Sequence, residues 1–112
     1  MPPLKETKLN ELEPFPGYKG KAIHSKNMTV VFWDIEAGKP FNKHSHPNEQ
    51  ITVMIEGEIE MTIDNVTKIL KAKDMAIIPE NTIHFGKAIT NCKVVDVFYP
   101  VREDYKISSK IL

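Results

Sequence analysis

The 112-residue chain has one cysteine, no long apolar run and no cluster of like charge. Cys92 alone cannot form an internal disulfide, and a low cysteine content is ordinary for a reducing compartment. No apolar run approaches the roughly 20 residues that cross a bilayer, and residues 1–14 lack the apolar core of a signal peptide. The 15 basic and 15 acidic side chains cancel, which argues against nucleic acid or an anionic membrane as a partner. We expect a cytoplasmic protein that binds a small molecule or another protein.

Helices are scarce as well, since no segment shows three turns of helical periodicity. Short runs rich in β-branched and aromatic residues alternate with turn residues at intervals of about 8–12 residues, which is typical of an all-β sandwich or barrel. The length suits a single domain. The expected strands are residues 28–36, 50–57, 58–64, 66–70, 74–79, 87–92 and 93–100.

Two of these strands carry detailed patterns. Residues 58–64 alternate polar and apolar side chains, which predicts a half-exposed strand, and Asp64-Asn65 suits a tight hairpin turn after it. Residues 50–57 are apolar on both faces, as a strand between two layers would be.

The N-terminal part of the chain differs from the middle. Residues 1–20 contain four of the eight prolines together with Gly17 and Gly20, which favours an extended arm over a helix. We therefore divide the chain into an arm (1–20), a barrel (21–103) and a C-terminal tail (104–112).

The stretch HSHPNEQ at residues 44–50 contains the first candidate site. Side chains two residues apart on a strand share a face, so His44 and His46 can hold one ion. Such a pair alone is weak evidence, because surface and core histidines are commoner than ligands. His84 follows Pro79 by five residues at the end of a later strand, and it completes a metal site if the sheet rolls up.

The spacing of these residues resembles the two motifs of the cupin superfamily. GKPFNKHSHPNEQITVMIEG matches the first motif at Gly38, His44, His46, Gln50 and Gly57. KDMAIIPENTIHFGKA matches the second at Pro79 and His84, but it has Lys73, Asn81 and Ala88 where the motif has Gly, Gly and Asn. The resemblance covers residues 28–100 and implies the cupin jelly-roll barrel. It also implies one divalent metal near the barrel mouth, bound by His44, His46, Gln50 and His84.

Gln50 stands where most metal-binding cupins have Glu, and Glu49 lies beside it. If one strand carries residues 44–50, Glu49 faces away from both histidines, so parity favours Gln50. Three neutral imidazoles and an amide oxygen leave a divalent ion its full charge, which suits a Lewis acid and disfavours a higher oxidation state. Nickel, zinc, iron, cobalt and manganese all accept imidazole, so the pattern does not define the metal.

A second candidate cluster lies in VVDVFYPVRED, residues 94–104. Asp96 and Phe98 share a strand face, and a carboxylate in an apolar run needs a partner because burying a lone charge is costly. Arg102 follows just past the strand end. One interpretation is an Asp96–Arg102 ion pair that ties the tail to the barrel, with Phe98 in the core. The other is that all three residues line the site.

The same segment, together with Gln50, resembles the KdgF family of cupins, which open the ring of 4,5-unsaturated uronates. The resemblance implies that Asp96 moves protons, that Arg102 binds the substrate carboxylate and that Phe98 walls the sugar ring. It further implies a homodimer whose substrate is a carboxylated sugar. Two alternatives remain: a cupin dioxygenase that uses iron and oxygen, and a non-catalytic module that binds a sugar or small acid.

Overall fold

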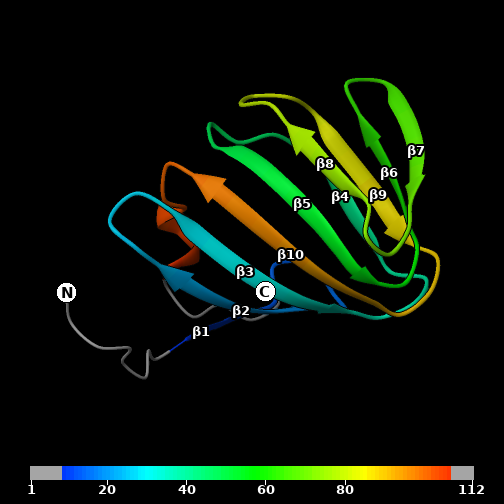
Figure 1. Cartoon of the computed structure of the whole chain (residues 1–112), viewed down its shortest axis with the longest axis horizontal. Coiled ribbons are helices and arrows are strands. Elements are labelled where there is room, and N and C mark those ends of the chain that lie inside the picture. Colours follow the sequence, from blue (N-terminus) through cyan, green and yellow to red (C-terminus); the bar gives the residue numbers. More distant parts are fainter. Residues whose placement is uncertain (1–8, 107–112) are drawn as a thin grey trace.

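The computed structural model describes residues 9–106, which form ten strands and one short 3-10 helix (Figure 1). The elements are β1 (Asn10–Leu12), β2 (Tyr18–His24), β3 (Thr29–Ile35), β4 (Pro40–His44), β5 (Glu49–Glu56), β6 (Ile59–Ile63), β7 (Val66–Leu70), β8 (Met75–Ile78), β9 (His84–Ala88), β10 (Cys92–Tyr99) and the helix η1 (Glu103–Tyr105). Within this part of the chain, no helical segment has the length and hydropathy of a bilayer span.

The strands form two antiparallel sheets that enclose the core. The larger sheet has the order β1-β2-β3-β10-β5-β8, and the smaller has the order β4-β9-β6-β7. In each sheet some neighbouring strands come from distant parts of the sequence, such as β3 and β10 or β4 and β9, as in a jelly roll. The core between the sheets is mainly apolar and includes Val31, Met54, Ile78 and Phe98, each at most 2% exposed. The predicted all-β jelly-roll barrel is confirmed.

β10 lies in the middle of the larger sheet, paired with β3 on one side and β5 on the other. Burial alternates along this strand, with Val94, Asp96 and Phe98 buried. Because alternate side chains of a strand point to opposite faces, β10 brings a carboxylate and an aromatic ring to the inside of the barrel. The predicted shared face of Asp96 and Phe98 is therefore confirmed.

Within the described part of the chain, four non-glycine residues adopt the left-handed backbone conformation at turns. Asp64 and Asn65 join β6 to β7 with φ of 48° and 66°, which confirms the predicted hairpin. Asn81 and Lys73 stand where the second cupin motif has glycine, and their φ angles are 56° and 78°. Lys73 keeps this turn although the conformation disfavours a side chain, and its N–H donates to the Met54 carbonyl at 2.9 Å.

One expected strand is wrong. Residues 87–92 do not form a single strand, because β9 ends at Ala88 and β10 begins at Cys92. The chain turns between them, where the N–H groups of Ile89 and Thr90 both donate to the Glu58 carbonyl, at 2.9 and 3.3 Å. These bonds replace the ladder contacts that a continuous strand would make.

The arm expected at residues 1–20 joins the larger sheet over its described part. β1 pairs with β2, and β2 already begins at Tyr18, so the proposed boundary at residue 21 falls inside a strand. η1 crosses the proposed boundary between the barrel and the tail, and its Tyr105 is buried in the core. Residues 1–8 of the arm and 107–112 of the tail lie outside the described residues. The three-part division of the chain stays a prediction.

β5 is covered on only one face within residues 9–106. Its inner side chains include Met54, which is 1% exposed, whereas Ile51 and Ile55 on the outer face are 40% and 44% exposed. The sequence predicted that this strand lies between two layers. Residues 9–106 supply the layer on the inner side of β5 and none on its outer side.

Candidate metal centre

Three histidines from two distant segments meet inside the barrel. His44 is the last residue of β4 and His84 is the first of β9, and the two are direct partners in the register of the smaller sheet. His46 follows in the loop after β4. One ring nitrogen from each histidine lies within 4.8 Å of the others, a spacing at which three imidazoles can hold one metal ion.

Hydrogen bonds fix which nitrogen of each ring faces the cluster. The Nδ1 atoms of His44, His46 and His84 lie 2.6, 3.0 and 2.8 Å from the backbone carbonyls of Asn42, Asn48 and Thr82. A carbonyl oxygen can only accept, so each Nδ1 carries a proton and each Nε2 of a neutral ring keeps its lone pair. Metal-ligating imidazoles in proteins show this arrangement, with the second ring nitrogen donating to a carbonyl or carboxylate.

Burial favours the neutral form of these rings. It lowers the pKa of His84 to about 4, and it lowers the pKa of His44 and His46 as well. The positive charge of Arg102 acts in the same direction on all three. At neutral pH the Nε2 lone pairs are therefore available to a cation.

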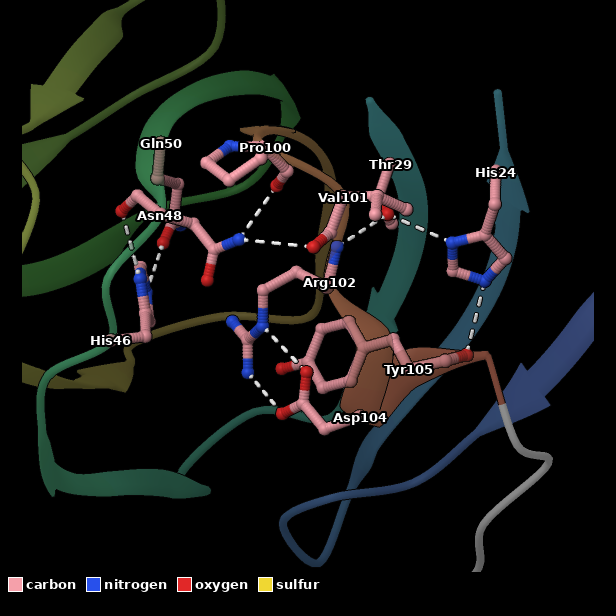
Figure 2. A network of polar contacts seen from close by, with 10 residues as sticks. All are labelled: His24, Thr29, His46, Asn48, Gln50, Pro100, Val101, Arg102, Asp104 and Tyr105. Carbon is pink, nitrogen blue, oxygen red and sulfur yellow. Dashed lines mark hydrogen bonds and ion pairs between the residues drawn. The ribbon is translucent and has the colours of Figure 1, made fainter. Parts of the chain in front are cut away.

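Gln50 points its amide oxygen at the same place. Its Oε1 atom lies 3.0 Å from Nε2 of His46 (Figure 2). Its amide nitrogen donates to Thr52 Oγ1 at 3.0 Å. The Thr52 hydroxyl donates its single proton to Asp96 Oδ1 at 2.7 Å, so towards Gln50 it can only accept. The Gln50 amide must therefore turn its nitrogen to Thr52 and its oxygen to His46. Two lone-pair atoms thus approach each other with no proton between them. A cation bound to both would satisfy them, so the donor set fits a metal ion.

The unbroken strand expected through residues 44–50 is wrong, although Gln50 was the right choice for the residue that faces the histidines. β4 ends at His44 and β5 begins at Glu49. Pro47 lies in the loop between them and has no N–H for a ladder bond. The two candidates are separated instead by β5 alone, in which Gln50 is buried and Glu49 is exposed.

Asp96 is buried beside this cluster with both carboxylate oxygens bonded. Oδ1 accepts from Thr52, and Oδ2 accepts from Trp33 Nε1 at 2.8 Å. Burial raises the pKa of the Asp96 carboxyl, while hydrogen bonds from Thr52, Gln50 and Trp33 oppose the rise. The carboxylate that the sequence placed in an apolar run is therefore solvated by side chains.

Arg102 pairs with Asp104 and not with Asp96, so the ion-pair interpretation of Asp96 and Arg102 is wrong. Its Nε and Nη2 atoms donate to the two carboxylate oxygens of Asp104, at 3.0 and 2.7 Å (Figure 2). The guanidinium carbon lies 4.8 Å from the ring centre of Phe98 and 3.9 Å from that of Tyr105. These aromatic faces and the forked ion pair hold Arg102 in one position.

The two predicted clusters face one cavity of about 60 Å³. Its lining includes His44, His84 and Gln50 from the first cluster and Asp96, Phe98 and Arg102 from the second. His46 adjoins it through Phe98, with 5.6 Å between the ring centres.

The sequence pattern missed the residues that position this site. Thr52 and Trp33 orient Asp96, and Asn48 contacts both His46 and the segment after β10 (Figure 2). The Asn48 carbonyl accepts from His46, and the Asn48 amide donates to the Pro100 carbonyl at 2.6 Å. Thr52 had a detectable signal, since it lies two residues after Gln50 on the same strand face. Asn48 had none, because its contact spans 52 residues.

Comparison with known families decides the classification. The sequence profile described as Cupin domain matches residues 31–98, more than half of the chain. The chain belongs to the cupin family. An RmlC-like cupin from Shewanella frigidimarina matches this cupin with 25% identity and a TM-score of 0.80, over 88% of this chain and 89% of the other.

Two further solved structures share the fold of this cupin. KdgF from Halomonas sp. is 24% identical with a TM-score of 0.78, over 85% of this chain and 89% of the other. Oxalate decarboxylase from Bacillus subtilis, a protein with Mn(II) centres, is 17% identical with a TM-score of 0.74, over 82% of this chain and 27% of the other. A search of curated proteins found no match.

Proposed function

We propose that His44, His46, His84 and Gln50 bind one divalent transition metal. The support is the donor set itself: three neutral imidazoles present Nε2 lone pairs, and the amide oxygen lies 3.0 Å from one of them. Nickel, zinc, iron, cobalt and manganese are all compatible with these ligands.

The reaction that fits this site best is ring opening of a 4,5-unsaturated uronate to its linear keto form. The observation that carries this proposal is the shared cavity, which Asp96, Phe98 and Arg102 line together with the neutral metal ligands. Each of the three groups suits one feature of a small sugar acid. The carboxylate can transfer a proton, the aromatic ring can pack on the sugar ring, and the guanidinium can bind the substrate carboxylate. The likeness to KdgF from Halomonas sp. agrees with this choice.

The bound metal would polarise a substrate oxygen and stabilise the negative charge that develops there as the ring opens. Asp96 would carry the proton, taking it from the anomeric hydroxyl or delivering it to the enol carbon. Thr52 and Trp33 already hold the two Asp96 oxygens, so the carboxylate needs no reorientation during the reaction.

Arg102 would bind the carboxylate of the substrate. Asp104 occupies Nε and Nη2 of the guanidinium, so the substrate would bind Nη1 or exchange with Asp104. Phe98 contacts both Arg102 and His46, and it would form the apolar wall against the sugar ring.

The test combines metal analysis of the purified protein with incubation of the metal-loaded protein and unsaturated galacturonate. We expect one metal per chain and loss of the ultraviolet absorbance of the substrate. His84→Ala should lose both properties. His24→Ala is the matched control for metal content, because His24 is the one histidine outside the cluster among the four in the sequence.

Other outcomes would favour the alternatives. Oxygen consumption by the iron-loaded protein, with the uronate left intact, would identify a dioxygenase. Uronate binding without turnover would identify a binding module. A wild-type protein that takes up no metal would contradict the proposal itself.

A further inference from the structure

Arg102 is the one arginine among the 15 basic residues of the chain, and its side chain lines the cavity beside the candidate metal ligands. This side chain is 8% exposed, whereas the side chain of Asp104, which accepts from it at 3.0 and 2.7 Å, is 63% exposed. The Asp104 carboxylate therefore lies on the solvent side of a buried cation. It is ionised at neutral pH, because the bonds from Arg102 hold the pKa of the Asp104 carboxyl below its usual range.

The residues on both sides of Asp104 are anchored independently of its side chain. The Arg102 N–H donates to Oγ1 of the fully buried Thr29 at 2.9 Å (Figure 2). Tyr105 is buried, its carbonyl oxygen lies 3.1 Å from Nε2 of His24, and its ring packs on the Arg102 guanidinium (Figure 2). Rotation of the Asp104 side chain alone can therefore free the guanidinium edge while Arg102 stays in place.

The two partners of this ion pair depend on each other to different degrees. Within residues 9–106, no side chain other than that of Arg102 donates to the Asp104 carboxylate, and an exposed carboxylate that leaves it is readily solvated by water. The buried guanidinium has no such alternative, because burying an unpaired charge is costly. Arg102 therefore needs a carboxylate on this edge, and a carboxylate from a ligand meets that need as well as Asp104 does.

A ligand carboxylate that enters the cavity meets an edge that is already occupied. Asp104 uses Nε and Nη2 of Arg102, two parallel donors of the kind that a carboxylate prefers. A second carboxylate on Nη1 would lie beside the first, and two like charges at one site repel each other. Exchange avoids this repulsion, because the ligand takes over the two donors and Asp104 turns to solvent.

We propose that Asp104 occupies the carboxylate-binding edge of Arg102 in the free protein and is displaced when an acid binds there. This inference rests on the proposed role of Arg102 as the group that binds the substrate carboxylate. Asp104 lowers the affinity of Arg102 for every carboxylate by the same factor, because each ligand must break the same ion pair. An acid that also binds the metal keeps a second attachment, whereas a simple acid at Arg102 has none. Asp104 is thus a specificity-determining residue that keeps simple carboxylates off Arg102.

Titration calorimetry of the zinc-loaded full-length chain tests this exchange. The ligands are galacturonate, whose saturated ring does not undergo the proposed reaction, and galactose, which lacks the carboxylate. We expect Asp104→Asn to bind galacturonate at least about fivefold more tightly than the wild type. Galactose should bind the two proteins equally.

Glu103→Gln is the matched control for the loss of one negative charge. Glu103 lies in the same turn, is 72% exposed and pairs with Lys106, so this variant removes an equal charge without breaking a bond to Arg102. Its affinity for galacturonate should stay within about twofold of the wild type, because solvent and salt screen an exposed charge.

Acetate provides a probe that does not depend on a sugar. Its binding can be followed by nuclear magnetic resonance at the Nε–H signal of Arg102, which is a single signal because the chain has one arginine. The acetate concentration that half-saturates this signal should be lower in Asp104→Asn than in the wild type, by the same factor as for galacturonate. Far-UV circular dichroism verifies the fold, and Asp104→Ala repeats both measurements if Asp104→Asn does not fold.

Three results would overturn the proposal. Carboxylate binding that is equal or weaker in the Asp104 variants would mean that Asp104 supports Arg102 and does not compete for it. Equal tightening in Glu103→Gln, or equal tightening for galactose, would assign the effect to overall charge or to access. Failure of the proposed reaction gives a different result: the Asp104 variants would still bind acetate more tightly, while the unsaturated uronate would stay intact.

Discussion

The two faces of the larger sheet differ in character where β5 and β10 lie side by side. Gln50, Thr52 and Asp96 point inward and are at most 8% exposed, whereas Ile51 and Ile77 point outward and are 40% and 65% exposed. In most antiparallel sheets the apolar side packs on the core and the polar side faces water. Here the inner side carries these three polar side chains among apolar core residues such as Met54 and Phe98, while Ile51 and Ile77 face outward.

The difference shows that burial follows from partners as well as from hydrophobicity. Among the described residues, apart from the two acceptors His46 Nε2 and Gln50 Oε1 that face each other, no buried side-chain nitrogen or oxygen lacks a hydrogen-bond partner, so the polar groups of the inner side are compatible with a stable core. The apolar outer side has no such compensation within residues 9–106. The polar groups of the inner face therefore stay buried among the core residues because they bind one another.

Removal of the inner carboxylate should have the largest effect. Asp96→Ala leaves the Trp33 N–H and the Thr52 hydroxyl without their acceptor and removes the proposed proton carrier. We expect turnover to fall by about 10²–10⁴-fold and the free energy of unfolding to fall by about 1–3 kcal/mol. Kinetics on the metal-loaded protein and urea denaturation measure the two effects. Asp34→Ala, an exposed carboxylate on the outer side of β3, is the control, and equal losses in both variants would refute the assigned role.

Acid should destabilise the metal-free protein through the inner face. The pKa of His84 is about 4 in the folded chain and near 6.5 in the unfolded chain, so the unfolded state binds more protons between these values. Stability is therefore full above about pH 6.5 and falls as the pH drops toward 4, by a few kcal/mol, since one pKa unit corresponds to about 1.4 kcal/mol. Urea unfolding across this range measures the slope. His84→Gln should flatten it, and an equally steep slope in that variant would assign the effect to other groups.

Loss of the hydroxyl that links Gln50 to Asp96 should have a moderate effect. Thr52→Val keeps the volume of the side chain but frees the Gln50 amide to rotate, so we expect metal affinity to fall by about 10–100-fold. Titration calorimetry with zinc or nickel measures this change. Thr52→Ser retains the hydroxyl and should restore most of the affinity. If Thr52→Val bound metal as tightly as the wild type, the amide would not need this support.

Substitution of Ile51, which precedes Thr52 but lies on the outer face, should have the smallest effect on the stability and metal affinity of the single chain. Ile51→Thr introduces a hydroxyl one position away from Thr52 but on the exposed side of β5. At dilutions where the chain is monomeric, we expect the free energy of unfolding to change by less than about 0.5 kcal/mol and the metal affinity to stay the same. A loss of affinity similar to that of Thr52→Val would erase the distinction between the two faces.

The sequence predicted the elements that depend on local periodicity and motif spacing. Alternation placed Asp96 and Phe98 on the inner face, and the motif positions located His44, His46 and His84. The prediction for Asp96 and Phe98 succeeded because a side chain's direction on a strand depends only on the parity of its position. The histidines were located by motif spacing instead, since His46 lies in a loop where parity does not apply.

The rest depended on contacts that no local pattern records. One of the two interpretations paired Arg102 with Asp96, yet the short helix η1 places Asp104 beside Arg102, two residues away. The break after His44 also escaped prediction, because the motif spacing does not distinguish a strand from a loop. The metal, the reaction, the cytoplasmic location and the homodimer stay predictions.

Asn48 unites two tasks in one residue. Its main-chain oxygen orients His46, and its side chain holds Pro100, two residues before Arg102. The histidine cluster and the segment that carries Arg102 are therefore linked through one residue. A substitution at position 48 removes the amide bond to Pro100 but keeps the main-chain oxygen that accepts from His46, so its direct effect falls on the segment that carries Arg102.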